Sequence, residues 1–140
     1  YHYHATPRVL YSTDAQTFDD ADCATAGPSP VIGFALDGFP LFGPCIADAS
    51  GIVRAAQASY RLREGKRQPV EGYETPYVAG VVETTTYNGQ FSGDFEFVAG
   101  LGDLDACIGM MVDGQYGYYV TEGFPYAIGC FSGTPIVPRR

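Results

Sequence analysis

The sequence predicts a mainly β fold, formed by a single compact domain of short antiparallel strands and hairpins with long loops and two disulfide bonds. Three observations lead to this prediction. Runs rich in Tyr, Val, Phe and Thr, which favour strands, alternate with turn-forming X-Gly dipeptides. The four cysteines form no C-x-x-C motif, so disulfides are favoured over a zinc site. The length suits one domain, which we expect to span residues 1–140.

Three hairpins are predicted, each around a two-residue turn that ends in glycine. A type I′ turn suits Asp-Gly and Asn-Gly, because both of its central residues need positive φ. Pro40 has no N–H to donate to a neighbouring strand, so we expect it at a sheet edge or a bulge. The hairpins run from Val31–Leu36 through Asp37-Gly38 to Phe39–Phe42, from Val81–Tyr87 through Asn88-Gly89 to Gln90–Val98, and from Met110–Val112 through Asp113-Gly114 to Gln115–Thr121.

Signals for helix are sparse. Ser50–Arg61 contains three alanines and fits a helix of two or three turns, whereas Ser59–Arg63 alternates as a strand does. Thr13–Pro30 is polar, small and Pro-containing, which predicts a long loop held by Cys23. A second loop is predicted over Glu64–Pro76.

The cysteines indicate an exported protein. An even cysteine count together with few lysines and many Tyr, Gly and Pro residues is typical of secreted, extracellular or cell-surface chains. Four buried free thiols are the alternative. Four cysteines allow three pairings, and the sequence does not choose among them. We favour Cys23–Cys45 and Cys107–Cys130, because these bonds close local loops.

The charge balance excludes some partners. Eight basic and sixteen acidic side chains give a net charge of −8, which argues against nucleic acid and against an anionic membrane surface. No apolar run approaches the roughly 18 residues of a membrane span, so membrane insertion is not expected. Nine acids and no Lys or Arg lie between residues 68 and 138. This region must be solvated, paired with the basic stretch at residues 54–67, or neutralised by a cation.

Four of these acids are calcium candidates. Asp94 and Glu96 precede the Gly102-Asp103-Leu104-Asp105 segment, so four carboxylates fall within twelve residues. Calcium takes 6–8 oxygen ligands, which acidic loops can supply. The EF-hand spacing is absent, and the alternative is that these residues cap turns or face water.

The two histidines are candidates for a transition metal. His2 and His4 would point to the same face of a strand, about 6.5–7 Å apart, and can share one ion. A third ligand would have to come from a carboxylate, a cysteine or the terminal amine. The alternatives are two structural histidines or a general acid/base role. Asp37, which precedes Gly38, is expected to be a turn residue.

Six ordered blocks of the chain resemble the bacterial family called the YHYH domain. The resemblance covers nearly the whole chain and implies a shared fold and export, but no particular reaction. Members usually carry a stretch before the Tyr-His-Tyr-His, and many have a His where this chain has Gly117, which weakens the transition-metal hypothesis. The blocks are Tyr1-His2-Tyr3-His4 with Thr6-Pro7, then Val31 to Pro44, Ser59 to Leu62, Asp94 to Cys107, Tyr116 to Thr121 and Phe124 to Tyr126.

A non-enzymatic role is favoured over an enzymatic one. We expect an extracellular structural or surface protein that binds calcium through its acidic loops and self-associates into a homo-oligomer or homopolymer, such as a filament or layer. The first alternative is a copper, zinc or iron enzyme that uses His2 and His4 with a carboxylate such as Asp37 or Glu96. The second is a soluble module that binds a glycan or peptide through exposed tyrosines.

Overall fold

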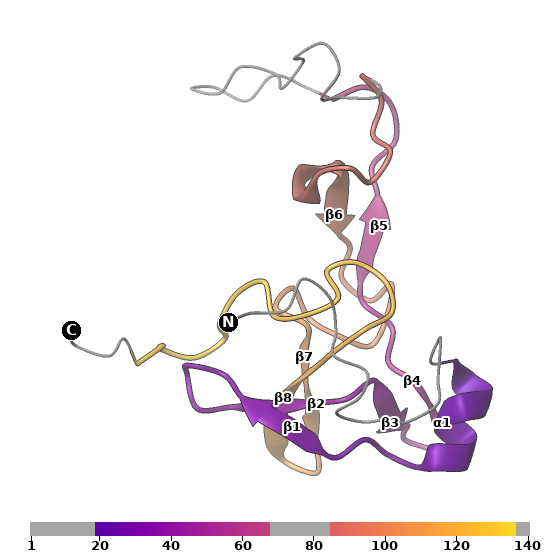
Figure 1. The fold of residues 1–140 in the computed structure, drawn as a ribbon, viewed down its shortest axis with the longest axis vertical. Helices are drawn as coiled ribbons and strands as arrows, with labels where there is room; N and C mark the ends of the chain where they lie inside the picture. Colours follow the sequence, from indigo (N-terminus) through magenta and orange to yellow (C-terminus); the bar gives the residue numbers. More distant parts are fainter. Residues whose placement is uncertain (1–18, 68–84, 137–140) are drawn as a thin grey trace.

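A four-stranded sheet and a projecting two-stranded arm organise the structure (Figure 1). The computed structural model describes residues 19–67 and 85–136. We call residues 60–67 and 85–98 the arm, and the other described residues the body. The elements are α1 (Asp20–Ala26), β1 (Val31–Phe34), β2 (Pro40–Phe42), β3 (Cys45–Ala47), β4 (Val53–Ala55), β5 (Tyr60–Leu62), the short 3-10 helix η2 (Ser92–Asp94), β6 (Phe95–Phe97), β7 (Gly109–Val112) and β8 (Gln115–Tyr119).

The main sheet has the strand order β1-β2-β8-β7. Its outer pairs are antiparallel hairpins, as predicted, but β2 and β8 are parallel, with Leu41 opposite Tyr118. Pro40 therefore begins an inner strand, and its expected place at a sheet edge is wrong. The first position of a strand tolerates proline, because strand pairing only begins there and the missing N–H breaks no bond in the middle of the ladder.

The two hairpin turns of this sheet differ. Asp113 and Gly114 have φ values of 51° and 79°, so the predicted type I′ turn is confirmed. At the other hairpin only Gly38 has positive φ, at 87°. The N–H of Ala35 donates to the Phe39 carbonyl, which leaves a three-residue loop centred on Asp37. The predicted type I′ turn is wrong there. The loop has three residues instead of two, and in such a loop an ordinary turn is followed by a glycine with positive φ that completes the reversal of the chain.

The described part of the third predicted hairpin, residues 85–98, pairs with another segment instead of with itself. β6 pairs with β5, with Arg61 opposite Glu96, and Thr86 forms a bridge with Lys66. Residues 81–84 lie outside the described part of the chain. The helix considered for Ser50–Arg61 is also wrong, since β4 and the start of β5 lie there. The alternative strand pattern over Ser59–Arg63 is confirmed.

A short helix replaces part of the predicted Thr13–Pro30 loop. The Asp19 carboxylate accepts hydrogen bonds from the N–H groups of Ala21 and Asp22, and the Asp22 carboxylate accepts one from Asp19. This reciprocal cap satisfies N–H groups that a helix start otherwise leaves open. The Asp20 side chain then accepts the N–H of Ala55, which ties α1 to β4.

The favoured disulfide pairing is confirmed. Cys23–Cys45 joins α1 to β3, and Cys107–Cys130 joins the start of the β7 hairpin to the C-terminal segment. Each bond closes a loop of just over twenty residues, for which chain-entropy arguments give on the order of 3 kcal/mol. Two disulfides are consistent with an oxidising, extracellular setting.

The core lies against one face of the main sheet. Phe42 stacks on Tyr119 with ring centroids 5.0 Å apart, and Ile46, Leu104 and Ile108 are almost fully buried behind them. Gly117 lies beneath Phe42, because a Cβ there would come within 2.5 Å of the ring. The position where many family members are expected to have His thus requires a small residue in this packing.

We expect Gly117→Ala to lower the free energy of unfolding by about 1–3 kcal/mol, the usual cost of overpacking. Gly33→Ala is the matched control, because no heavy atom lies within 4 Å of a Cβ at that strand position. Urea denaturation followed by tyrosine fluorescence measures both. Equal midpoints for Gly117→Ala and the wild type would contradict the packing argument.

Candidate functional site

A polar network covers the face of β8 that points away from the core. The Tyr118 hydroxyl donates to Oδ2 of Asp37 at 2.5 Å, and the N–H of Gly133 donates to the same oxygen at 3.0 Å. The N–H of Ser132 donates to the Tyr118 hydroxyl at 2.7 Å. The C-terminal segment is therefore fastened to the β1–β2 turn through Tyr118, which is fully buried.

The network continues through Tyr116. Its hydroxyl lies 2.5 Å from Oγ of Ser132 and donates to Oδ2 of Asp105 at 2.7 Å. The other Asp105 oxygen accepts the N–H groups of Cys107 and Gly109. Gly109 is required here, because a Cβ would overlap the Tyr116 hydroxyl. Two carboxylates are thus linked through two tyrosines and a serine, and we call this set the tyrosine network.

The protonation states of the network suit a structural lock. Burial acts to raise the pKa of Asp37, but the hydrogen bonds from Tyr118 and Gly133 outweigh it, so the pKa is lowered. Burial and the adjacent Asp37 raise the pKa of Tyr118, and burial likewise raises that of Tyr116. At neutral pH the tyrosines are fixed donors and Asp37 is a fixed acceptor. The lowered pKa makes Asp37 a weaker proton acceptor than an ordinary Asp side chain.

Asp94 makes a buried ion pair with Arg67 inside the arm. Nε and Nη2 of Arg67 donate to the two Asp94 oxygens at 2.8 and 2.7 Å, and both side chains are at most 6% exposed. Oδ2 of Asp94 also accepts the N–H of Gly89 at 3.0 Å. The guanidinium lies over the Phe91 ring, 5.0 Å from its centroid. The contact with Arg67 lowers the pKa of Asp94 to about 2, against the effect of burial.

Asp103 makes a second bidentate pair. Nη1 and Nη2 of Arg54 donate to its two oxygens at 2.7 and 2.6 Å, and the N–H of Gln57 adds a third bond. Arg54 also lies 3.8 Å from Asp48. Hydrogen bonding to Arg54 is the main cause of the lowered pKa of Asp103.

The four calcium candidates therefore have separate partners. Asp94 contacts Arg67, Asp103 contacts Arg54, Asp105 contacts Tyr116 and backbone N–H groups, and Glu96 lies 2.8 Å from Arg61 and 3.6 Å from Arg63. Within residues 19–67 and 85–136, no three His, Cys, Asp or Glu side chains are grouped as metal ligands would be. Calcium binding stays a prediction, and at these carboxylates it would have to displace existing donors.

The histidine candidates cannot be placed. His2 and His4 lie outside the described residues, so their part in a metal site stays a prediction. Asp37, considered as a third ligand, lies in the β1–β2 turn as expected, and its Oδ1 is buried without a hydrogen-bond partner among the described residues. Glu96, the other carboxylate considered, faces Arg61.

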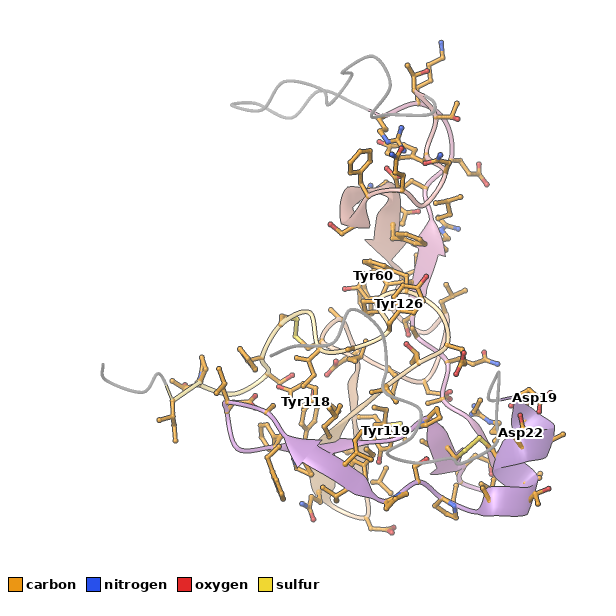
Figure 2. All side chains as sticks on the ribbon, viewed as in Figure 1. Asp19, Asp22, Tyr60, Tyr118, Tyr119 and Tyr126 are labelled. Atoms are coloured by element: carbon orange, nitrogen blue, oxygen red, sulfur yellow. A yellow bond between two sulfur atoms is a disulfide. The ribbon has the colours of Figure 1, made fainter. Side chains whose placement is uncertain are left out.

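Sequence reasoning missed two hollows and the tyrosine network. A groove of about 690 Å³ lies between the β3–β4 turn and β7, with Asp48, Asp103 and Met111 in its lining. A hollow of about 430 Å³ lies at the base of the arm, with Tyr60, Phe95 and Phe124 in its lining. Figure 2 shows Tyr60 and Tyr126 at this base, and Tyr118 and Tyr119 in the sheet below. Short motifs do not reveal such sites, because their walls come from distant segments.

The buried pair gives a pH-dependent prediction. We expect Asp94→Asn to lower the free energy of unfolding at pH 7 by about 3 kcal/mol, because it leaves the Arg67 charge buried without its counterion. Glu96→Gln, at an exposed pair, should cost less than about 1 kcal/mol.

The sign of the pH effect follows from the lowered pKa of Asp94. A carboxyl whose pKa is lowered in the folded state stabilises the fold at pH values above its ordinary pKa of 3.8. This stabilisation is lost as the pH falls toward about 2, the pKa of Asp94 in the folded protein. The gap between wild type and Asp94→Asn, measured by urea titration at several pH values, should narrow over that window. A gap independent of pH would contradict the assignment.

No helix among the described residues is long and apolar enough to cross a membrane. Comparison with known proteins found one family. No curated protein and no solved structure matches the chain. The sequence model of the family described as YHYH protein matches residues 1–133, which is most of the 140-residue chain. The resemblance seen in the ordered motifs is thereby confirmed, and the chain belongs to the YHYH protein family.

Proposed function

We propose that this chain is an extracellular, non-enzymatic structural or surface protein whose subunits associate with one another. In this association the arm of one subunit contacts the acidic body of the next. The observation that carries the proposal is the arm itself, which projects from the body (Figure 1) and exposes Leu62 and Phe97 beside the basic residues 60–67. The two disulfides suit a protein that works outside the cell.

The arm has two unlike faces. The strand register places Tyr60 opposite Phe97 and Leu62 opposite Phe95, so these four side chains share one face. Arg61 and Glu96 share the other face. Leu62 and Phe97 remain 42% and 39% exposed. An isolated two-stranded ribbon is marginal in water, so further burial of its apolar face would be favourable.

Charge also differs between one strand of the arm and the body. Residues 60–67 carry four basic side chains and one acid, whereas residues 68–98 carry five acids and no Lys or Arg. The described body carries one basic and nine acidic side chains. The unlike charges of residues 60–67 and the body favour contact between different copies and raise the rate of encounter. The basic residues of the arm are Arg61, Arg63, Lys66 and Arg67, and the single basic residue of the described body is Arg54.

A contact between unlike surfaces is heterologous, and it leaves one free arm and one free body at the ends of every complex. Repetition then gives a ring if the rotation closes and a filament if it does not. This symmetry supports the homopolymer expected from the sequence, without fixing which of the two forms.

A second function is favoured by one observation. The hollow at the base of the arm has aromatic walls from Tyr60, Phe95 and Phe124, and Arg61 lies beside it. Aromatic rings with a nearby polar group are suited to a glycan or peptide. Subunits that remain monomeric at every concentration would favour this binding module over the structural role.

We expect the wild-type chain to form species larger than its 15.0 kDa subunit as concentration rises, and Leu62→Glu to remain monomeric. The substitution removes apolar surface from the arm and reverses its charge. Phe34→Glu is the matched control, because Phe34 is 73% exposed but lies on β1 of the body. Multi-angle light scattering after size exclusion reads the mass, and raised salt should weaken the assembly. A wild type that stays monomeric would refute the proposal.

Calcium gives a separate expectation. Calcium binding remains a prediction, but we expect the contact between subunits not to depend on it, because the candidate carboxylates already accept hydrogen bonds from arginine, tyrosine or backbone N–H groups. EDTA should then leave the wild-type solution mass unchanged. Light scattering in millimolar calcium and then in EDTA tests this. A mass that falls in EDTA and recovers on adding calcium, but not magnesium, would instead establish calcium as part of the assembly.

A further inference from the structure

We infer that the groove between the β3–β4 turn and β7 is the docking site for the arm of a second copy of this chain. The inference rests on the proposed function and assigns the surface that receives the arm. We call this surface the β7 groove. Its volume of about 690 Å³ has room for several side chains of a two-stranded ribbon.

The floor of the β7 groove is apolar. Ile46 and Val112 come from facing elements of the body, and Met111 lies beside them with 60% of its surface exposed. Methionine side chains are unbranched and adapt to a partner's shape, which suits a docking surface. Exposed apolar side chains on a strand that is an edge among the described strands are a known liability unless a partner covers them.

The rim of the groove is acidic. Asp48, Asp103 and Asp113 line it together with a single basic residue, Arg54. Arg54 is already held by two hydrogen bonds to Asp103. The groove thus presents an apolar floor with a surplus of negative charge around it.

The arm has a matching apolar patch with a small positive surplus beside it. Leu62 and Phe97 are exposed on the same face of the paired strands. Arg61 lies on the other face opposite Glu96, which is also 3.6 Å from Arg63, so these three side chains together leave one positive charge. With Leu62 over the apolar floor, this charge comes within a Debye length of the acidic rim. The arm extends away from β3 and β7 in its own subunit, so a second copy is the natural source of this occupant (Figure 1).

Met111→Lys tests the groove. It adds a positive charge where we expect Leu62 and the neighbouring Arg61 and Arg63 to dock, at an exposed position where folding should be unaffected. We expect this variant to be monomeric under conditions where the wild type assembles, while Phe34→Lys, the matched control on the opposite edge strand, assembles normally. Should Met111→Lys melt early, Asp113→Asn provides a milder test, since Asn keeps the positive φ of the turn.

A mixing experiment then identifies the two surfaces as partners. Leu62→Glu keeps an intact groove, and Met111→Lys keeps an intact arm. Neither should assemble alone, but an equimolar mixture should form a complex of two subunits that does not grow further, because the remaining arm and groove are both blocked. Native mass spectrometry separates this dimer from longer species.

The outcomes distinguish the two proposals. A wild type that is monomeric at all concentrations refutes the proposed function, and the docking site with it. A wild type and a Met111→Lys variant that assemble equally well overturn the groove assignment but leave association through the arm intact. Two variants that are each monomeric but form no dimer when mixed also overturn it, because the surfaces would then not be complementary.

Discussion

The structure depends on how a chain with twice as many acidic as basic residues satisfies its carboxylates. Each well-buried acid has a fixed donor. Arg67 holds Asp94 in the arm, Arg54 of β4 holds Asp103 within the body, and Tyr118 holds Asp37 over the sheet. Removing one member of such a pair leaves a buried charge or acceptor without a partner, which costs far more than an exposed contact. These few donors therefore fix how separate segments meet.

This constraint also produces the charge division between the two parts. The arginines are concentrated at residues 54–67, and most of them serve the arm or its base. The body is left with carboxylates that backbone N–H groups and tyrosine hydroxyls satisfy, as at Asp105. Hydrogen bonds satisfy an acceptor but do not cancel its charge. The described body consequently stays strongly acidic, whereas residues 60–67 are basic, and in the proposed association this difference would attract one subunit to another.

The conformation of single turns was predictable from the sequence, whereas the pairing of strands and charged side chains from distant segments was not. Asp113-Gly114 specifies a turn by its own φ preferences, and this turn was predicted correctly. The segment 95–97 reads as a strand, but nothing in its own residues states that β5, over thirty positions away, is its neighbour. The same limit applies to the acidic segment. An Asp-x-Asp pattern looks alike whether it binds calcium or an arginine, and only the fold brings Arg54 to Asp103. The helix α1 was missed because its cap uses Asp22 where Glu is the familiar signal.

An arm with one open apolar face has a consequence for stability as well as for assembly. Its base is packed by Phe124, which stacks on Phe95 with centroids 4.1 Å apart, and its outer part is held by the pair between Arg67 and Asp94. Between these two points Leu62 remains largely in water. A neighbour that covers this face binds the folded state alone, because only the folded arm presents Leu62 and Phe97 together. In the proposed association, mass action would link the stability of each subunit to the concentration of the others, because folding and association would bury the same apolar surface.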